Sequence, residues 1–524
     1  MRRCGGVMMA ARAAVVALVV ARCCMPLARA APVVDAEMEA LTNLAHEWNE
    51  VRDASTWMRG RDCDSMDHVK CDGDGHVIAL FVTRCALVGP LPTALLALSH
   101  LKDLELEHCN QLPRSLPDTL GRLSSPMGLS TASHGNLKDS VPQELGNLQQ
   151  LTRLYLFGND LLDSLPEQLS QLQKLQSLHV SNHDYLSGEL PAWIFSLTDL
   201  TSLAIQRNNF SGSIPEAISS LKQLRKLVLE EKELSGSIPE AIGALTNLHN
   251  LQLHGNRLSG TIPAFITHLS GLTTLKLRSN SSLSGSIPEA ISSLKQLREL
   301  SLFDNGLSGS IPDAISSLQL LQELDLHCNR LSGTIPACFT HLTALTSLML
   351  NANHLAGTIP AAITTLTNLE ILHLENNQLT GELPSFHHIA RLTSQYGLSA
   401  DHNYLTSTAD PFPFNGTSLD SPSESHSLCL FYHNCLENDA ISCASWQNQR
   451  YGSECRAFCG AQPLTPPCSG HGVCSFVRDY SYDMSACEAE HELPPPYCAR
   501  EPEGQCDCDE GYTPGTAAGT CVPH

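Results

Sequence analysis

Few residues in this 524-residue chain have the types and spacing of a catalytic site. The segment HEWNE at residues 46–50 begins like a zinc-protease helix but lacks the second histidine that such a helix requires. The adjacent acids Glu230 and Glu231 follow a predicted strand, and a solvated face explains them better than an acid–base pair does. No nucleophile elbow, phosphate-binding glycine loop or dinucleotide fingerprint occurs. We therefore expect no enzyme activity, no cofactor and no metal site.

The cysteines instead predict disulfide chemistry in an exported protein. Residues 1–30 have the pattern of a secretory signal, with two early arginines, the apolar run AAVVALVVA and a small-residue site ARA, so the mature chain should begin at Ala31. A membrane anchor is the alternative, but Arg22 interrupts the run well short of the ~20 apolar residues that span a bilayer. Three of the 21 cysteines leave with this segment, and the remaining 18 predict disulfides rather than metal ligands.

The formal charge excludes two classes of partner. The signal contains five arginines and no acid, so its removal moves the net charge from −22 to −27. An acidic chain is not expected to bind nucleic acid or an anionic membrane. No later apolar stretch is long enough to span a bilayer, and no kinase-like segment follows residue 410. We expect a secreted or extracellular protein whose mature chain has no transmembrane segment. Association with a cell wall or cell surface is an alternative within this class.

The middle of the chain is a repeat. The string SGSIPEAISSLKQLR occupies residues 211–225 and returns unchanged at residues 284–298. Alignment on this string gives a 24-residue unit with leucine-like residues at positions 1, 4, 6, 11, 15, 19 and 22, Asn at position 9, Gly at position 13 and Pro at position 16. Three units and one added residue explain the offset of 73. We count fourteen units, which we call coils.

The period predicts a solenoid. LxxLxL alternates apolar and polar side chains like a half-buried strand, and one strand per coil can bury its leucines only if successive coils stack with their strands in parallel. The Asn at position 9 should point inward and satisfy backbone groups of the turn. The Gly and Pro of SGxIP fit a turn that needs a permissive residue followed by a fixed φ.

This pattern resembles the plant-type leucine-rich repeat family, whose signature is LxxLxLxxNxLSGxIP, over about residues 77–410. The resemblance implies an α/β solenoid, a right-handed superhelix with a concave parallel β-sheet. Residues 31–76 are similar to the N-terminal cap of that family, which implies a disulfide between Cys63 and Cys71. The Asn position departs from the family at five residues, where we expect looser or differently bonded coils: His134, His183, Lys232, Cys85 and Cys109.

The tail resembles an epidermal-growth-factor-like (EGF-like) module. Twelve cysteines lie within residues 429–521, including those of CSGHGVC and CDCDEGY. The pairing in that family implies the bridges Cys459–Cys474, Cys468–Cys506 and Cys508–Cys521. The long loop between the third and fourth cysteines adds Cys487 and Cys498, which we also expect in disulfides. The calcium-binding variety is not expected, because SECRAFC replaces its acidic cluster.

Other side chains give narrower expectations. N-glycosylation sequons occur at Asn209, Asn280 and Asn415. Asn280 is also a ladder position that should be buried, so we favour Asn415, in a Pro/Ser-rich linker. For the cysteines at position 9 of two coils, Cys85 and Cys109, buried thiols are favoured over a bridge. Cys328 and Cys338 are not expected to bond each other, since positions 8 and 18 lie on different sides of a coil.

A solenoid offers a wide sheet surface for binding, and positions 3, 5 and 7 of each coil should face outward there. The candidate contact residues are aromatic or charged: Arg153, Tyr155, Phe157, His179, Phe303 and His327. We expect the group Tyr155, Phe157 and His179 to be the most clustered.

Two functional classes follow. One is a recognition module that binds an extracellular protein, peptide or glycan. The other is a structural or adhesive protein of the matrix or cell wall. A truncated membrane-receptor ectodomain is a further alternative. The predicted organisation is a signal (1–30), cap (31–76), repeats (77–410), linker (411–428) and cysteine-rich tail (429–524), with the EGF-like module at 459–521.

Overall fold

The computed structural model describes the cap and most of the repeat region. Its described residues are 33–47, 63, 66–83, 93–107, 116, 118–123, 126–132, 139–159, 161–230, 233–386, 389, 391–392, 397–400 and 403–408, together with short strands between residues 473 and 523. The chain divides into two compact units, Met1–Ser177 and Leu178–His524, which are described separately. Expectations for Cys85, Cys109, His134, Lys232 and Asn415 lie outside the described residues.

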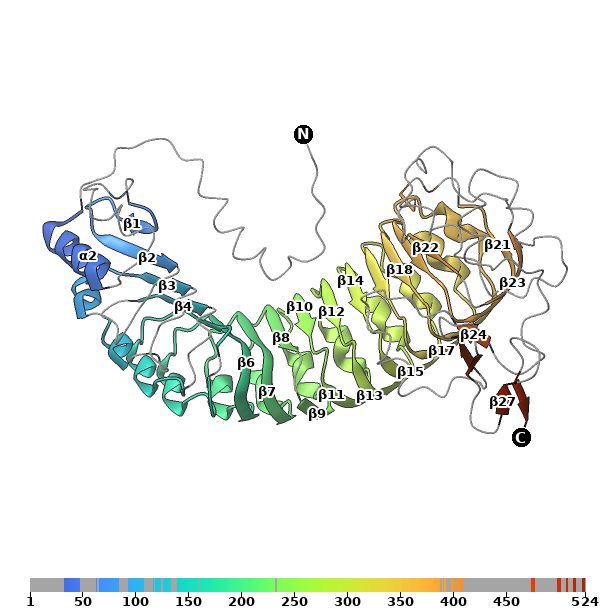
Figure 1. Ribbon diagram of the computed structural model, residues 1–524, viewed down its shortest axis with the longest axis horizontal. Helices are drawn as coiled ribbons and strands as arrows, with labels where there is room; N and C mark the ends of the chain where they lie inside the picture. Colours follow the sequence, from blue (N-terminus) through green and yellow to red (C-terminus); the bar gives the residue numbers. More distant parts are fainter. Residues whose placement is uncertain are drawn as a thin grey trace. The chain divides into compact units, whose positions relative to one another are not determined.

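Unit 1 begins with the cap. Helix α2 (Asp35–Glu47) precedes strand β1 (Val69–Cys71), which pairs antiparallel with β2 (Val77–Thr83). Three further strands continue from β2 in parallel, with the position-4 leucines aligned as Leu80, Leu104, Leu129 and Leu154. These strands are β3 (Asp103–Glu107), β4 (Gly128–Ala132) and β5 (Arg153–Phe157) (Figure 1). A disulfide joins Cys63 to Cys71, the pair that the resemblance to the family cap implies.

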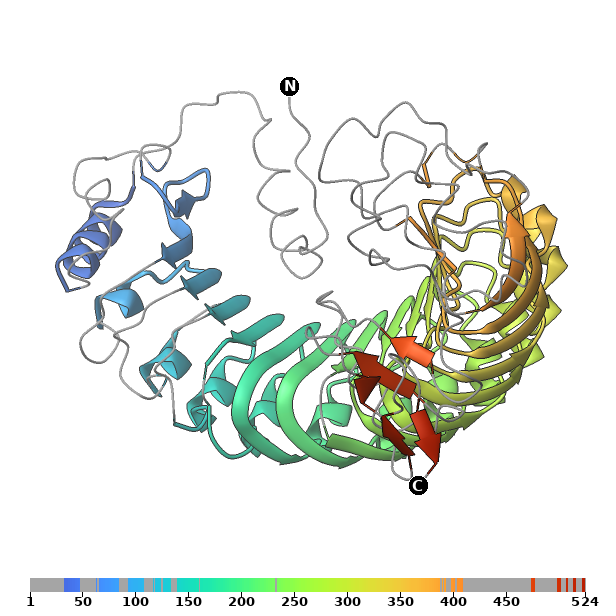
Figure 2. The ribbon, with the colours of Figure 1, turned by 45° about the vertical axis from the view of Figure 1, so that its right-hand side comes forward.

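Unit 2 contains a first row of short parallel strands, one per coil. The row runs from β7 (Ser202–Ser213) through strands that pair in chain order, with Leu251, Leu275, Leu300, Leu324 and Leu348 in register. Its other members are β8 (Lys226–Glu230), β10 (Asn250–Gln252), β12 (Thr274–Lys276), β14 (Glu299–Ser301), β16 (Glu323–Asp325), β18 (Ser347–Met349), β20 (Ile371–His373) and β22 (Leu398–Ser399). The LxxLxL segment is therefore a strand in each of these coils, which confirms the prediction (Figure 2).

A second row of parallel strands was not predicted. It occupies positions 9 to 14, where the sequence suggested only a turn, and Gly309 lies in it with φ of 77°. Glycine permits this left-handed conformation inside a strand. The row comprises part of β7 and then β9 (Glu233–Ser237), β11 (Arg257–Thr261), β13 (Asn280–Gly285), β15 (Asn305–Ser310), β17 (Arg330–Gly333), β19 (His354–Thr358), β21 (Gln378–Leu383) and β23 (Tyr404–Thr408). Strand β6 (Ser177–Glu189) precedes β7.

Wherever the structure describes a helix in a coil, it is a 3-10 helix, which corrects the expectation of an α/β solenoid. In the coil of η11 (Asp313–Ser317), Pro312 precedes the helix, and the N–H of Ile315 donates to the carbonyl of Pro312 at 3.1 Å. Five residues between Pro and Leu form only this tight turn. The other such helices are η2 (Thr93–Ala97), η3 (Asp118–Arg122), η4 (Gln143–Asn147), η5 (Glu167–Gln171), η6 (Ala192–Ser196), η7 (Glu216–Ser220), η8 (Glu240–Ala244), η9 (Ala264–His268), η10 (Glu289–Ser293), η12 (Ala337–His341) and η13 (Ala361–Thr365).

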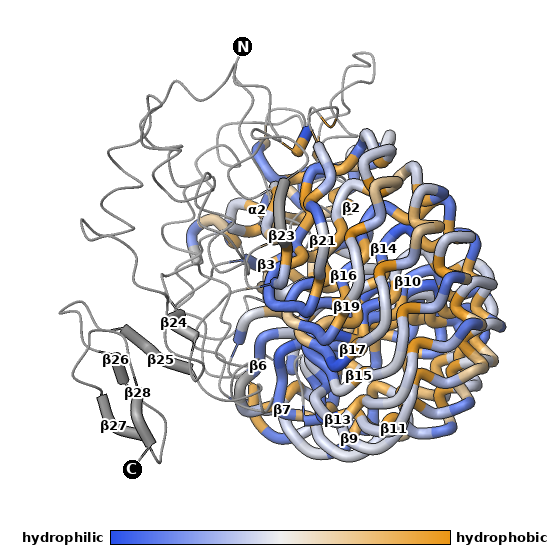
Figure 3. The backbone as a smooth tube through the Cα atoms, turned by 90° about the vertical axis from the view of Figure 1, so that its right-hand side faces the viewer, coloured by the Kyte–Doolittle hydropathy of each residue, from blue (hydrophilic) through white to orange (hydrophobic). Residues whose placement is uncertain are grey.

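The core of the coils is mainly leucine and isoleucine, and in most coils an asparagine at position 9 closes it. Hydrophobic and hydrophilic segments alternate along the coloured part of the tube (Figure 3). Asn329 is 3% exposed, its Oδ1 accepts from Leu307 N at 3.1 Å, and its Nδ2 donates to the carbonyls of Leu302 and Leu326 at 3.0 and 3.1 Å. The inward asparagine that satisfies backbone groups is thus confirmed. We call this series the asparagine ladder: Asn208, Asn256, Asn280, Asn305, Asn329, Asn353, Asn377 and Asn403.

Two coils bond the ladder differently. Asn208 accepts from the backbone N–H of His183, and Asn305 accepts from that of Asn280, whereas Asn329 accepts from Leu307, two residues further along the preceding coil. The coils that contain His183 and Asn280 both have 25 residues instead of 24. The different bonding was expected at His183 because of its side chain. Since it also occurs at an asparagine, the added residue explains it better.

The tail contributes two small sheets to the described residues. One consists of β24 (Val473–Ser475), β25 (Tyr497–Arg500) and β26 (Cys506–Asp507), and the other of β27 (Tyr512–Pro514) and β28 (Cys521–Pro523). The cysteine pairings predicted for the EGF-like module lie outside the described side chains and remain predictions. Among the described residues, no helix has the length and apolar character needed to cross a bilayer.

Candidate ligand-binding surface

The first strand row of unit 2 presents polar and aromatic side chains on one face. Along each strand the position-4 and position-6 leucines are buried, such as Leu300 and Leu302 at 0% exposure, while positions 3, 5 and 7 point the other way. Within unit 2 the strands follow the inner side of the bend (Figure 1). We call the surface formed by positions 3, 5 and 7 the strand face.

An aromatic stack lies in the middle of the strand face. The rings of Phe303 and His327, from consecutive coils, are stacked with their centroids 4.2 Å apart. The guanidinium of Arg278, one coil earlier, lies 5.1 Å from the centroid of Phe303 on the ring face. The Nδ1 atom of His327 contacts Oδ1 of Asp325. We call Arg278, Phe303 and His327 the Arg–Phe–His stack. It places a cation, an aromatic ring and an oriented imidazole side by side on three coils.

Charged groups border the stack at positions 3 and 5. Lys276 and Glu299 form an ion pair across two coils. Loss of solvent raises the pKa of the Glu323 carboxyl, and the nearby Glu299 carboxylate raises it further. Two acids therefore compete for one lysine, which leaves negative charge beside the stack.

A buried acid–imidazole pair lies at position 7 of two earlier coils. Nε2 of His254 is 3.0 Å from Oε2 of Glu230, and the two side chains are 5% and 15% exposed. Burial would raise the pKa of Glu230, but the His254 hydrogen bond and the charges of His254, Arg278 and Arg207 together hold it below its ordinary value. Glu230 is therefore an anion fixed by cations, which agrees with a structural or binding role and not with a proton donor.

His179, at position 5 of the strand face, has a strongly lowered pKa. Desolvation, together with a smaller contribution from the charge of Lys226, lowers its pKa to about 4. Its Nε2 atom lies 2.8 Å from Oγ of Ser202 on the next strand. His179 is thus neutral at physiological pH and acts as a hydrogen-bonding group rather than a charge.

The other sequence candidates lie in unit 1. The rings of Tyr155 and Phe157 are stacked with centroids 5.7 Å apart, and Arg153 forms an ion pair with Asp103. The expected group of Tyr155, Phe157 and His179 divides between the two units, so it remains a prediction. Phe303 and His327, predicted only as separate candidates, are the pair that the structure brings into contact. Arg278 and Asp325 complete that site and could be found from the sequence, since they occupy outward positions of adjacent coils.

The modification and thiol predictions have mixed outcomes. Asn280 is wrong as a glycosylation site, because its side chain is 0% exposed and both its amide atoms bond to the backbone of the ladder. Asn209 is exposed and stays a candidate. Cys338 is a free, half-buried thiol and Cys328 is disulfide-bonded, so the two do not bond each other, as expected.

One cluster of potential metal ligands was missed. The sequence analysis expected no metal site, yet Glu37, His76 and His100 place one ligand atom each within 4.8 Å of one another in unit 1. Their positions differ by up to 63 residues, so no local motif marks them. A usable signal exists, however, because His76 and His100 are 24 residues apart and therefore precede equivalent strands.

Comparisons with known proteins identify the repeats. Residues 246–307 and 310–355 match one leucine-rich repeat family, and residues 199–221 and 368–388 match a second. Comparison with curated proteins found no match.

Three solved structures illustrate the likeness of fold. The plant peptide hormone receptor RGFR1, solved in complex with RGF2, is 29% identical with a TM-score of 0.56, and the alignment covers 65% of this chain and 56% of that one. A TDR receptor is 27% identical with a TM-score of 0.53, covering 63% of each chain. An internalin from Listeria monocytogenes is 19% identical with a TM-score of 0.50, covering 73% of this chain and 98% of that one. This chain therefore spans about three fifths of the two receptor chains. The protein has leucine-rich repeats, and its fold is similar to that of plant leucine-rich-repeat receptor ectodomains.

Proposed function

We propose that this protein is an exported recognition protein whose strand face binds a peptide or a segment of another extracellular protein. Similarity to RGFR1, a receptor solved in complex with RGF2, supports ligand recognition by this fold. The Arg–Phe–His stack is the observation that carries the proposal to particular residues.

The composition of the stack favours binding over a purely architectural role. Arginine and aromatic side chains dominate the energies of protein interfaces when they lie at the centre of a contact surface. Asp325 holds the His327 ring, so less side-chain freedom is lost when a ligand covers it. The core of the coils does not require these residues, since buried leucines such as Leu300, Leu302 and Leu307 already fill it.

The shape of the strand face favours an extended ligand. Neighbouring strands of a sheet lie about 4.8 Å apart, so the three members of the stack span roughly 10 Å across the sheet. This spacing lets one extended peptide contact several coils in turn. The acids Glu299 and Glu323 on the same face favour a basic group in that peptide, near the aromatic rings. A glycan is the second ligand class, because aromatic side chains also stack on sugars.

A quantitative capture experiment tests the proposal. The mature chain, Ala31 to His524, is immobilised and exposed to extracellular fluid from its source, and the captured ligand is then titrated. We expect saturable binding that Phe303→Ala weakens at least tenfold. Lys222→Ala is the matched control, because Lys222 is exposed away from the strand face and should leave binding unchanged.

Two outcomes would contradict the proposal. Equal affinity of the wild type and Phe303→Ala would exclude the strand face around the stack. Self-association of the chain without a saturable ligand would instead favour the structural or adhesive class.

A further inference from the structure

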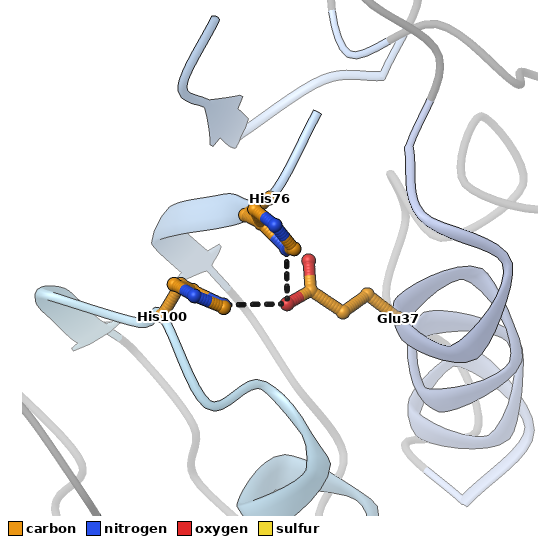
Figure 4. Close-up of side chains that lie close together, drawn as sticks. All are labelled: Glu37, His76 and His100. Atoms are coloured by element: carbon orange, nitrogen blue, oxygen red, sulfur yellow. Dashed lines mark hydrogen bonds and ion pairs between the residues drawn. The ribbon is translucent and has the colours of Figure 1, made fainter. Parts of the chain in front are cut away.

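The geometry points to a divalent transition-metal site in the N-terminal cap, formed by Glu37, His76 and His100, with Zn²⁺ as the ion that fits best. This inference is independent of the strand face. It rests on the distances, burial and support of three side chains that converge from separate segments of unit 1 (Figure 4).

The three ligands come from three elements that the cap brings together. Glu37 lies in the first turn of α2, His76 lies immediately before β2, and His100 lies shortly before β3. Both histidines precede strands of adjacent coils, so the stacking of those coils places one ring over the other with centroids 3.8 Å apart. The helix then directs the Glu37 carboxylate at the same edge of both rings (Figure 4).

The distances fit shared coordination better than shared hydrogen bonding. Nδ1 of His76 and Nδ1 of His100 each lie 3.4 Å from Oε1 of Glu37. A hydrogen bond from a ring N–H to a carboxylate is usually shorter, at about 2.7–2.9 Å. By contrast, tetrahedral Zn²⁺ with bonds of about 2.0–2.1 Å separates its ligand atoms by about 3.3–3.4 Å. Both Nδ1–Oε1 distances equal such an edge, and a turn of the two stacked rings would direct their Nδ1 atoms at a shared ion.

The surroundings hold the carboxylate in place. Glu37 is 3% exposed, and its second oxygen, Oε2, accepts from the N–H of Val77 at 2.6 Å. The backbone N–H of Val34, beside the start of α2, donates to the carbonyl of Gly75 at 3.2 Å, which ties the helix to the turn that precedes β2. Carboxylate metal ligands are usually held in this way, with one oxygen in a hydrogen bond to the protein and the other available for the ion.

Hydrogen bonds orient the two histidines, and both are accessible from solvent. Oδ1 of Asp72 accepts from the backbone N–H of His76 at 2.9 Å and orients that turn, while Nδ1 of His100 also lies 3.2 Å from Oγ of Ser99. The side chains of His76 and His100 are 29% and 49% exposed, so an ion can enter from solvent. Water can occupy the fourth position. Imidazole and carboxylate ligands with one open position suit Zn²⁺ and disfavour Ca²⁺ and Mg²⁺, which prefer oxygen alone.

The bound ion would join helix α2 to the first two coils. Such a link closes the end of the solenoid, where the repeat pattern offers no further coil to cover the apolar core. With three protein ligands the site should bind reversibly, and the ion should stabilise the folded cap by mass action.

Zinc titration of the full mature chain tests the inference. The chain is stripped with a chelator, in a Cys338→Ser background that removes the free thiol among the described residues, and titrated with ZnCl₂ by calorimetry and by thermal unfolding. We expect one Zn²⁺ per chain at this site and a rise in Tm that equal concentrations of Mg²⁺ do not produce. His100→Ala should weaken this binding at least tenfold and abolish the rise in Tm.

Matched variants make the outcome decisive. His46→Ala removes an exposed histidine from the same helix and should bind Zn²⁺ like the parent. Glu37→Gln keeps an acceptor for the Val77 N–H but removes the charge, so it should weaken binding while the metal-free Tm stays close to that of the parent. Co²⁺ should give the visible absorption of a tetrahedral nitrogen and oxygen site in the parent, and lose it in His100→Ala. Unchanged Zn²⁺ affinity in His100→Ala, or an equal loss in His46→Ala, would overturn the inference.

Discussion

Positions 7 and 9 of a coil, the last position of the strand face and the position of the asparagine ladder, lie two residues apart and differ completely in character. At position 9 the side chain is the same amide in eight coils, and it is buried in each. At position 7 the side chain changes from coil to coil, as Glu230, His254, Arg278, Phe303, His327, Asn351 and Glu375.

The difference follows from what the backbone demands. A coil leaves N–H and carbonyl groups unpaired beyond the first strand row, the same ones in most coils, and an asparagine satisfies several of them at once. The side chain at position 7 is not needed to satisfy backbone groups, because it points away from the core. Repetition therefore marks the requirements of the fold, and variation marks the part of the coil that is free to carry recognition.

The largest expected effect is the loss of a ladder residue. Asn329→Ala removes the acceptor of the Leu307 N–H and one of the two amide donors to the carbonyl of Leu302, which keeps its bond from Asn305. The unpaired buried N–H costs about 1–3 kcal/mol and the lost hydrogen bond about 1 kcal/mol, so we expect a loss of about 2–4 kcal/mol in the free energy of unfolding. Asn305→Ala should cost a similar amount. Denaturant unfolding measures both, with Lys222→Ala as a control that should change stability by less than about 0.5 kcal/mol. Equal effects at Asn329 and Lys222 would remove the distinction between ladder and surface.

His179 tests whether a strand-face residue can also govern stability. Its pKa is lowered from 6.5 to about 4, so folding disfavours the protonated form. The neutral His179 therefore contributes its full stabilisation above pH 6.5. The free energy of unfolding falls as the pH decreases from 6.5 towards 4, by up to about 3 kcal/mol. His179→Gln should flatten this part of the curve of unfolding free energy against pH. The idea fails if the wild type and the variant lose stability in parallel over that range.

A glycine substitution at position 8, between the two strand rows, should raise the free energy of unfolding instead of lowering it. Ala352 has φ of 52°, which costs an L-residue about 1–2 kcal/mol, while Gly255 occupies the same position of another coil. Ala352→Gly should therefore raise the free energy of unfolding by up to about 1 kcal/mol. Ala356→Gly, in strand β19, is the control and should lower it by about 0.5–1 kcal/mol. Destabilisation by both variants would show that the left-handed conformation carries no strain here.

The smallest expected effect on stability belongs to the Arg–Phe–His stack. Phe303→Ala removes a half-exposed ring whose stacking contributes about 1 kcal/mol, although its effect on ligand affinity should be at least tenfold. Unfolding and binding measured on the same preparation separate the two effects. A loss of several kcal/mol in unfolding free energy would place Phe303 with the ladder as a residue that the fold requires.

The features that recur from coil to coil could be predicted from the sequence. Buried leucines with a period of two residues gave the first strand row, and a polar residue at one fixed position gave the ladder. The second strand row was missed because Gly309 and its equivalents indicate a turn locally, and only pairing with the neighbouring coil turns that segment into a strand. The left-handed conformation at position 8 was missed for a related reason, since residues as different as Asp304, Cys328 and Ala352 adopt it under constraint from the adjacent coils.

For the two candidate sites as well, the sequence predicted what depends on the repeat period and not what depends on side-chain rotation or helix docking. Phe303 and His327 were identified because outward positions can be counted along the repeat, whereas their stacking depends on side-chain rotation that spacing does not specify. The Glu37 cluster depends on how helix α2 docks on the first coils. That docking joins segments outside the repeat to segments within it, so the period contains no information about it.

Photo-crosslinking of the captured ligand to the wild-type chain is the most direct test of the recognition surface. A ligand that carries a photoreactive group should form its crosslinks with residues 274–278, 299–303 and 323–327 of the strand face, and Phe303→Ala should reduce their yield. Crosslinks that fall instead on the 3-10 helices at residues 289–293 and 313–317, with yields unaffected by Phe303→Ala, would contradict the assignment of ligand recognition to the strand face.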